Sequence, residues 1–349
     1  MRITHLTFSL LNGGKENMLV DIANEQSLQG HEVGIIVINN KLDSSIVNRI
    51  QSTVTLYQIG KGSSKINLFP YLKFLFILLF KCKPDIIHSH DASLGTILRY
   101  FKTSKNVLTV HGPGISVNPM KYYGRLFAIS KAVKEDVKKR SGLECKLIYN
   151  GIYTDQIVAK NDFVPQKTFR VVMVKRLNHE RKGQDLLIEA ANIIIHKKKR
   201  TNFRFYLVGG GESEDFLRNL IHSYDLSVHV QLLGNWEREK VYDSLCNYDL
   251  FVHPSRFEGF GLTVVEAMAA KIPVVASDIE GPAEILENGT YGFLFENEHV
   301  EQLTEKILQA EKMYLEGEIK PFIDRAYNHC LSNFDIRKTA KNYCDNYLK

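Results

Sequence analysis

The feature that most constrains the fold is an order of apolar strand, turn and amphipathic helix that repeats along the whole chain. A strand that returns to its sheet through a helix runs parallel to its neighbour, so this order predicts parallel sheets covered by helices. We expect strands at residues 3–11, 31–39, 85–91, 106–110, 127–130 and 147–149, and then at 170–174, 203–208, 228–233, 248–252, 273–277 and 292–295. Two such series predict an α/β protein with two Rossmann-like, doubly wound domains that face each other across a ligand-binding cleft.

The length of the chain and a break in its periodicity support this division. With 349 residues, 44% of them hydrophobic, the chain is long for a single core. No clear periodicity runs from residue 153 to residue 168, as expected of a connection between domains. We therefore expect an N-terminal domain at residues 1–153 and a C-terminal domain at 154–334. A C-terminal helix at about 335–349 is expected to pack back on the first domain.

Hydropathy and cysteine usage favour a cytoplasmic protein. The longest apolar stretch, residues 68–80, is interrupted by Lys73 and is too short to span a bilayer. Most of its apolar face is expected to be core. The N-terminus runs directly into a strand pattern and offers no signal-peptide segment. Five cysteines without a Cys-x-x-Cys pair favour reduced thiols over a zinc site or disulfides.

The charge of the chain is divided unevenly between its halves. Residues 1–150 carry 20 Lys and Arg against 10 Asp and Glu, and residues 151–349 carry 25 against 29, which gives net charges of +10 and −4. A basic half suggests an anionic partner such as a membrane surface, although a solvated lysine-rich surface explains the same count. Nucleic acid is not expected, because no basic run is interleaved with aromatic residues.

Residues 253–270 combine two carboxylates with a glycine turn and a helix start. Gly261 lets the backbone turn between Glu258 and the helix expected from about Leu262, and Glu266 lies one turn into that helix. The unpaired N–H groups of a helix start bind anions. In a simpler explanation, Thr263 and Glu266 form a capping box and Glu258 is a solvated loop acid.

Other polar residues follow the expected strands. Gly13 and Gly14 stand between the first strand and its helix, where they can serve phosphate binding or form a tight turn. His88 and His90 lie two residues apart on a strand, and without an evident third ligand they favour packing or polar lining over a metal site.

Arg176 and Lys182 suit a diphosphate in the second half of the chain. They follow the strand at 170–174 at a spacing of six, and two cations with a helix start can neutralise charge that builds on a leaving group. No Asp-x-Asp pair is present to hold a divalent ion, so we expect no metal.

Residues 170–295 carry a set of motifs in one order. These are Arg176-Leu177, Lys182-Gly183, Gly209-Gly210-Gly211-Glu212, Leu233-Gly234, Pro254-Ser255, Glu258-Gly259-Phe260-Gly261-Leu262, Glu266-Ala267-Met268-Ala269, Pro273 to Ser277, and Glu284-Ile285 to Gly292. In this order they resemble the C-terminal half of a retaining glycosyltransferase of family 4, with the GT-B fold, of the type that builds bacterial cell-surface polysaccharide or lipopolysaccharide. The N-terminal half is similar more loosely, through Gly13-Gly14, residues 84–90, Val110-His111-Gly112, Ser130 and Asn150-Gly151.

The resemblance implies roles at the matching positions. Glu258 would lie by the hydroxyls of the donor sugar, Glu266 by the ribose hydroxyls, and His111 by the sugar near its anomeric carbon. Arg176 and Lys182 would clamp the diphosphate together with backbone N–H groups of the two helix starts. The implied catalytic residues are Glu258, His111, Arg176 and Lys182, and the implied donor-binding residues are Gly13, Gly14, Gly261, Leu262, Thr263 and Glu266.

The implied activity is that of a retaining, metal-independent hexosyltransferase (EC 2.4.1.-) without a cofactor. It would move a hexose or N-acetylhexosamine from a nucleoside-diphosphate sugar, with UDP favoured, to a glycan or lipid-linked glycan in surface polysaccharide biosynthesis. The protein would be cytoplasmic, with peripheral contact at the anionic inner face of the membrane. A nucleotide-sugar epimerase of the same fold, a glycan phosphorylase and a non-catalytic GT-B partner subunit are the alternatives.

Three positions depart from the family pattern. Lys175 stands where a glycine usually precedes the arginine, and Lys271 replaces the glycine that usually ends the helix. Both look structural. A residue other than glycine at a left-handed helix end costs about 1 kcal/mol of stability. Glu280 replaces a loop glycine close to the expected sugar, and it leaves the identity of the donor open.

Overall fold

The computed structural model describes residues 1–61, 68–101, 105–164 and 166–348, and it divides into two compact units. The first unit contains Met1–Ile152 and Phe334–Lys349, and the second contains Tyr153–Asn333. The boundaries expected from the sequence lie one residue from this division. The chain therefore leaves the first unit once and returns to it at its end.

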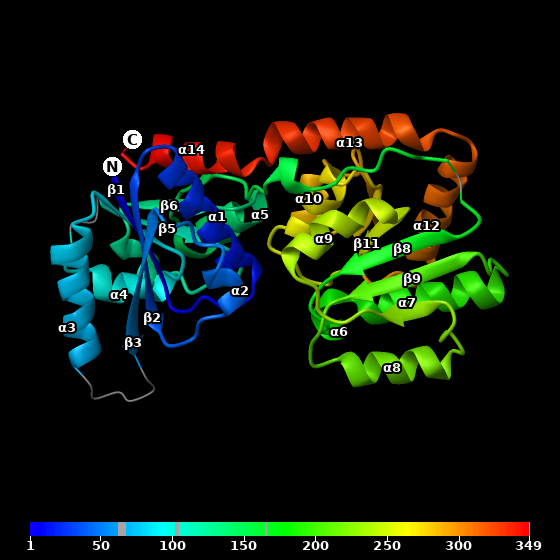
Figure 1. The fold of residues 1–349 in the computed structure, drawn as a ribbon, viewed down its shortest axis with the longest axis horizontal. Coiled ribbons are helices and arrows are strands. Elements are labelled where there is room, and N and C mark those ends of the chain that lie inside the picture. The colour runs from blue at the N-terminus through cyan, green and yellow to red at the C-terminus, as the bar shows by residue number, and fades with distance from the viewer. Residues whose placement is uncertain (62–67, 102–104, 165, 349) are drawn as a thin grey trace. The chain divides into compact units, whose positions relative to one another are not determined.

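The first unit is built on a seven-stranded parallel sheet of order β3-β2-β1-β4-β5-β6-β7 (Figure 1). The strands are β1 (Arg2–Thr7), β2 (Glu32–Asn39), β3 (Val54–Lys61), β4 (Ile86–Ser89), β5 (Asn106–Val110), β6 (Arg125–Ala128) and β7 (Cys145–Leu147). Its α-helices are α1 (Gly14–Leu28), α2 (Ser44–Val47), α3 (Phe69–Phe76), α4 (Gly95–Leu98), α5 (Lys131–Ser141) and α14 (Ile336–Asn346). The π-helix η1 (Ile77–Cys82) continues α3, and short 3₁₀ turns lie at Ala92–Leu94 and Asn118–Tyr122.

The second unit repeats the plan with a six-stranded parallel sheet of order β10-β9-β8-β11-β12-β13. The strands are β8 (Phe169–Val174), β9 (Phe203–Val208), β10 (Val230–Leu232), β11 (Leu250–His253), β12 (Val274–Ser277) and β13 (Phe293–Phe295). The helices are α6 (His179–Lys182), α7 (Gln184–Asn192) with its π extension η6 (Ile193–Lys197), α8 (Glu214–Ser223), α9 (Arg238–Ser244), α10 (Leu262–Ala269), α11 (Glu280–Ile285), α12 (Val300–Leu315) and α13 (Ile319–Asn333). Short 3₁₀ turns lie at Thr154–Gln156 and Leu245–Asn247.

Both sheets reverse the direction in which strands are added, between β1 and β4 in the first and between β8 and β11 in the second. In doubly wound sheets, ligands bind outside the carboxyl ends of the strands at this switch point. The fold therefore marks one position for binding in each unit. All twelve expected strands are present, with ends that differ by up to four residues.

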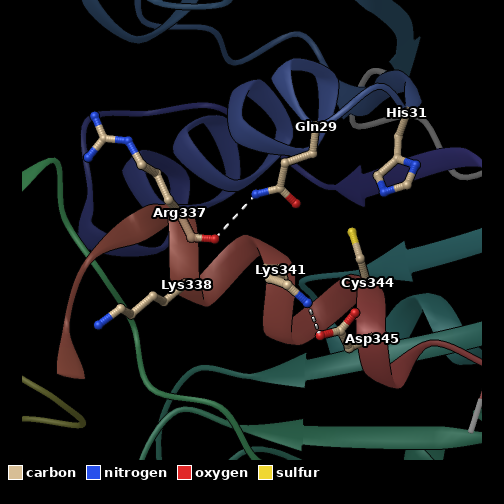
Figure 2. A pocket seen from close by; sticks show the side chains of 7 residues that line it. All are labelled: Gln29, His31, Arg337, Lys338, Lys341, Cys344 and Asp345. Carbon is tan, nitrogen blue, oxygen red and sulfur yellow. Dashed lines mark hydrogen bonds and ion pairs between the residues drawn. The ribbon is translucent and has the colours of Figure 1, made fainter. Parts of the chain in front are cut away.

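The last helix, α14, completes the first unit although it comes from the far end of the sequence. Tyr343 and Tyr347 are buried, and the Tyr347 hydroxyl accepts a hydrogen bond of 2.7 Å from Gln26 Nε2 on α1. Gln29 Nε2 donates to the Arg337 carbonyl at 3.2 Å, as Figure 2 shows. Helices α1 and α14 therefore lie side by side through polar as well as apolar contacts.

The apolar stretch at residues 68–80 is more exposed than the sequence suggests. Pro70, Phe74, Ile77 and Leu78 are buried. The exposed side chains are Leu68, Phe69, Leu72, Phe76, Leu79 and Phe80. Most of these lie three or four residues apart, so α3 and η1 present an apolar strip to the surface. The prediction that most of this face belongs to the core was therefore wrong. Among the described residues, no helix has the length and hydropathy that a bilayer crossing needs.

Candidate active site

Glu258 lies in the loop after β11 and accepts hydrogen bonds from two lysines. The Nζ atom of Lys175, directly after β8, is 2.7 Å from Glu258 Oε2, and the Nζ atom of Lys182, at the end of α6, is 3.0 Å from it. Burial alone would raise the pKa of this carboxyl, but the positive charges of Lys175 and Lys182 hold the pKa of Glu258 well below its usual range. Two ammonium groups therefore share one ionised carboxylate, and the cluster has a net positive charge.

His253, the last residue of β11, is the third neighbour of Glu258. Its Nε2 lies 3.6 Å from Glu258 Oε2, which is too far for a hydrogen bond, and this nitrogen has no other hydrogen-bond partner in the described parts of the chain. Burial and the positive charge of Lys175 lower the pKa of His253 to about 4. The imidazole is therefore neutral, and it adds no third positive charge to the cluster.

Two glycines allow the loops of this cluster to approach one another. Gly183 follows Lys182 with φ 71°, and a Cβ there would lie 1.9 Å from the Pro254 carbonyl oxygen. Gly209 has φ 141°, and a Cβ there would lie 1.9 Å from the Lys175 carbonyl oxygen. Only glycine fits such positions without backbone movement. The glycines therefore allow Lys175, directly after β8, and Lys182, at the end of α6, to lie close to the loop after β11, at the switch point of the sheet.

Helix α10 begins beside this cluster. Gly261 is its N-cap with φ 114°, and Leu262 and Thr263 are its first two residues. Their N–H groups have no acceptor within the helix and favour an anion. Because the N-cap is Gly261 and not Thr263, the capping-box explanation of Thr263 and Glu266 is wrong. Glu266 is half-buried one turn further along α10.

Arg176 does not join Lys182 and Glu258. Its guanidinium is bonded to Glu212 at 3.1 and 3.2 Å, and 74% of its side chain is exposed. The structure therefore contains Lys182 with Lys175, and not Lys182 with Arg176, as the pair of cations next to Glu258. The clamp role expected of Arg176 stays a prediction.

Asp91 organises the corresponding position of the first unit. Its Oδ2 accepts hydrogen bonds from the Phe8 N–H at 2.9 Å and the Thr7 hydroxyl at 3.0 Å, and its Oδ1 accepts one from Lys15 Nζ at 2.7 Å. Gly13 is the extended N-cap of α1, with φ −153°, and Gly14 is the first helical residue. The carboxyl ends of β1 and β4 and the start of α1 therefore meet at the switch point of the first sheet.

His111, directly after β5, is the end of a series of hydrogen-bonded histidines. Its Nε2 lies 3.0 Å from His90 Nδ1, and His90 Nε2 lies 3.0 Å from His5 Nδ1. His5, His88 and His90 are buried and lie close enough together to be considered as metal ligands. The third possible ligand beside His88 and His90, which the sequence did not reveal, is therefore His5. It lies on β1, which pairs with β4.

Sequence reasoning missed Lys15, Asp91, His5 and Gln26, and it assigned Lys175 a structural role that the contact with Glu258 contradicts. The signal that could have revealed Lys175 was its position at the end of a strand, directly before Arg176. Lys271 does have the expected left-handed backbone, with φ 54°, and its ammonium group pairs with Asp324 at 3.1 Å. Glu280 is exposed at the start of α11.

A hollow of about 470 Å³ lies apart from both switch points, beside α14 (Figure 2). None of the expected site residues lines it; its walls are Gln29, His31, Arg337, Lys338, Lys341, Cys344 and Asp345. Lys341 pairs with Asp345 at 2.6 Å, which neutralises part of its basic lining.

The fold and the two clusters define a protein with two doubly wound α/β domains, each with polar residues at the switch point of its sheet. The family "Glycosyl transferases group 1" matches residues 155–328, and "Glycosyltransferase Family 4" matches residues 12–156. The chain belongs to the family 4 glycosyltransferases of the GT-B type.

Relatives and solved structures agree with this family. An uncharacterized glycosyltransferase of Methanocaldococcus jannaschii is 30% identical over 64% of this chain and 65% of its own length. A poly(ribitol-phosphate) alpha-N-acetylglucosaminyltransferase of Staphylococcus aureus is 36% identical over 40% of this chain and 26% of its own length. The chain thus spans less than two thirds of these relatives.

Among solved structures, a mutant of S. aureus TarM in complex with fondaparinux, alpha-GlcNAc-glycerol and UDP is similar in fold. Its TM-score is 0.83 at 16% identity, and the match covers 100% of both chains. At this identity the likeness concerns the fold alone.

Proposed function

We propose that this protein is a retaining, metal-independent glycosyltransferase that transfers a hexose or N-acetylhexosamine from a UDP-sugar to a glycan or lipid-linked glycan. The observation that carries the proposal is the contact of Lys175 and Lys182 with the ionised Glu258, beside the start of α10. A positively charged group at a switch point, next to free helix N–H groups, suits a diphosphate.

Lys182 is the residue that we assign to the diphosphate. To donate to a phosphate oxygen it must share or leave Glu258, and an isolated buried carboxylate would oppose that change. Lys175 removes the obstacle because it remains bonded to Glu258 at 2.7 Å. Lys175 thus keeps the carboxylate compensated while Lys182 binds the donor, and Leu262 and Thr263 add backbone N–H groups.

The other roles follow the family resemblance. Glu258 accepts hydrogen bonds from the donor sugar, Glu266 from the ribose, and Arg176 supports the diphosphate from its exposed position. In the first unit, His111 contacts the sugar near its anomeric carbon, and Gly13 and Gly14 form the turn whose N–H groups bind phosphate.

The proposed reaction needs no side-chain nucleophile. The acceptor hydroxyl attacks the anomeric carbon from the leaving-group side while the bond between that carbon and the phosphate oxygen breaks. The proton of the acceptor passes to an oxygen of the departing diphosphate, and the configuration of the sugar is retained. The positive cluster then stabilises the charge that develops on the diphosphate.

UDP-N-acetylglucosamine is the first donor to test. One relative is named as an alpha-N-acetylglucosaminyltransferase, and the TarM structure contains UDP and alpha-GlcNAc-glycerol. Purified protein should hydrolyse UDP-N-acetylglucosamine, UDP-glucose or GDP-mannose slowly without an acceptor, and should do so in EDTA. A requirement for manganese would contradict the metal-free clamp, and an epimerised nucleotide sugar would favour the epimerase.

Two substitutions test the cluster itself. Glu258→Ala and Lys182→Ala should each lower turnover by at least about 100-fold, the scale of losing a preorganised electrostatic contact. A half-exposed cation of the same unit, Lys306 on α12, provides the control, and Lys306→Ala should keep full activity. Near-full turnover by both cluster variants would end the assignment.

A peripheral membrane contact is proposed for the first unit. The apolar strip of α3 and η1 is exposed, and Lys73, Lys81 and Lys83 lie within or next to it, which suits insertion at an anionic lipid surface. This strip is a stronger basis than α5, where Lys138 pairs with Glu144 and Arg140 with Asp136.

Sedimentation with lipid vesicles tests this contact. The protein should sediment with vesicles that contain acidic lipid, be released as salt rises, and lose binding in Phe76→Ser. Binding to neither acidic nor neutral vesicles would favour a soluble acceptor.

A further inference from the structure

Four buried or half-buried side chains form one hydrogen-bonded series in the first unit, in the order Gln26, His5, His90, His111. Gln26 Oε1 lies 2.8 Å from His5 Nε2, His5 Nδ1 lies 3.0 Å from His90 Nε2, and His90 Nδ1 lies 3.0 Å from His111 Nε2. A neutral imidazole has one N–H and one acceptor nitrogen, so each bond determines the direction of the next.

The amide of Gln26 sets the direction of the whole series. Its Nε2 donates to the Tyr347 hydroxyl at 2.7 Å, so its Oε1 faces His5 as an acceptor. His5 must then carry its proton on Nε2 and accept on Nδ1. The same rule puts the proton of His90, and then that of His111, on Nε2. Nδ1 of His111 is left as an acceptor, and it has no hydrogen-bond partner among the residues that the structure describes.

A side branch agrees with this direction. The Tyr347 hydroxyl, which accepts from Gln26, is free to donate to His88 Nδ1 at 2.8 Å. His88 Nε2–H then donates to Thr109 Oγ1 at 2.7 Å, and Thr109 donates to the Tyr343 hydroxyl at 3.2 Å. Both nitrogens of each of His5, His88 and His90 are thus occupied by protein groups, and a metal ion would have to displace these bonds.

The imidazoles of the series remain neutral over the physiological range. Burial lowers the pKa of His5 to about 4, and burial together with the positive charge of Lys15 lowers the pKa of His111 to about 3, against the opposing effect of Asp91. Burial and the neighbouring imidazoles hold the pKa of His90 well below its usual range. A neutral series keeps one direction, whereas protonation would break it.

We propose that Gln26 sets the tautomer of His111 through His5 and His90, so that His111 offers an unprotonated Nδ1 to its ligand. Gln26, His5 and His90 are positioning residues, since they act through His111. A neutral acceptor nitrogen binds a hydroxyl, which can donate, and disfavours a carboxylate, which cannot. His111 should therefore favour a sugar with a hydroxyl at this position over a uronic acid. This preference rests on the proposed function, whereas the tautomer of His111 does not.

The tautomer can be measured directly in the full-length protein. Nitrogen NMR of protein labelled with ¹⁵N-histidine distinguishes a protonated from an unprotonated ring nitrogen. At neutral pH, His5, His90 and His111 should all carry the proton on Nε2. Protonation of His111 on Nδ1 would overturn the proposal, whatever the activity of the protein.

Substitution of Gln26 tests the direction of control. In Gln26→Met the Nε2–H of His5 would be buried without an acceptor, and an orphaned N–H is disfavoured more than an orphaned lone pair. The series should therefore invert, and His111 should carry its proton on Nδ1. Gln26→Glu retains the acceptor and should keep the original tautomer. An unchanged His111 in folded Gln26→Met would refute the role of Gln26.

His88→Asn is the matched control, because His88 is equally buried and stacks on His90 with ring centroids 4.4 Å apart, but it lies outside the series. It should leave the His111 tautomer unchanged. On UDP-sugar hydrolysis, Gln26→Met should lower kcat about tenfold, as loss of a supporting residue does, and leave KM unchanged. If the wild-type protein shows the expected tautomers but hydrolyses no UDP-sugar, the proposed function is refuted and the control of the His111 tautomer by Gln26 is not.

Discussion

Replacing Lys175 with methionine should weaken UDP binding and leave the fold intact. The Lys175 ammonium group is 2.7 Å from Glu258 Oε2, and only 11% of its side chain is exposed. In Lys175→Met, Lys182 at 3.0 Å becomes the one lysine that compensates Glu258. A phosphate that approaches Lys182 then meets a cluster without net charge.

The size of the effect follows from the missing charge. A unit charge about 5 Å from a phosphate, at an effective dielectric constant of about 20, contributes about 3 kcal/mol. Solvent that enters the vacated space recovers part of this, so we expect a loss of about 1.5 to 3 kcal/mol. UDP should bind about 10- to 100-fold more weakly, because 1.4 kcal/mol corresponds to a factor of ten.

Lys160→Met is the matched control for titration calorimetry with UDP. Lys160 is 8% exposed and pairs with Asp249 at 2.6 Å, and Asp249 keeps a second cation, Arg170, at 3.1 Å. Asp249 immediately precedes β11, whereas Glu258 follows it. The control therefore removes a buried, paired lysine at the amino-terminal end of this strand, away from the candidate site. UDP affinity within twofold of wild type in Lys175→Met, or tighter binding, would refute the reasoning.

Stability should depend on pH through the histidines of the first unit. The pKa of His5 falls from 6.5 in the unfolded chain to about 4 in the folded protein, so the unfolded state binds the extra proton, and stability should fall by about 3 kcal/mol for this group as pH drops from 6.5 to 4. Urea unfolding at pH 7 and pH 5 measures the trend, and equal midpoints would contradict it. At Lys271, glycine should relieve the φ of 54° and offset the lost Asp324 pair, so that Lys271→Gly changes stability by less than about 1 kcal/mol. Lys271→Ala should be less stable than Lys271→Gly in the same assay, because both lose the ion pair and only glycine relieves the backbone; the reverse order would contradict the strain assigned to this φ.

Much of the fold was predictable because the strands of a parallel sheet are buried on both faces and read as apolar runs. The exception is β3 (Val54–Lys61), which the sequence analysis did not predict. It is an edge strand in which Thr55, Gln58 and Lys61 are exposed, so its sequence lacks a continuous apolar run. The exposed face of α3 shows the opposite error, since an apolar run alone does not indicate which side is buried.

The site was predictable where its residues follow one another along a strand end, as Glu258 and the start of α10 do. The contacts that the sequence hid join residues far apart, such as His5 with His90, 85 positions away, and Gln26 with Tyr347, 321 positions away. A pattern of residue types carries no information about such pairs until the order of the strands is known. Lys175 was misjudged for a related reason, because its partner Glu258 belongs to another strand end.

The return of the chain to the first unit also determines the order in which the two units can be completed during synthesis. The second unit ends at Asn333, whereas the first needs α14 and the Tyr347 hydroxyl, which are synthesised after the second unit. Domains usually form in the order in which they are made. Here the first unit is completed by a segment that is made after the second unit, so a nascent chain can finish the second unit while Gln26 and His88 still lack the Tyr347 hydroxyl that joins them.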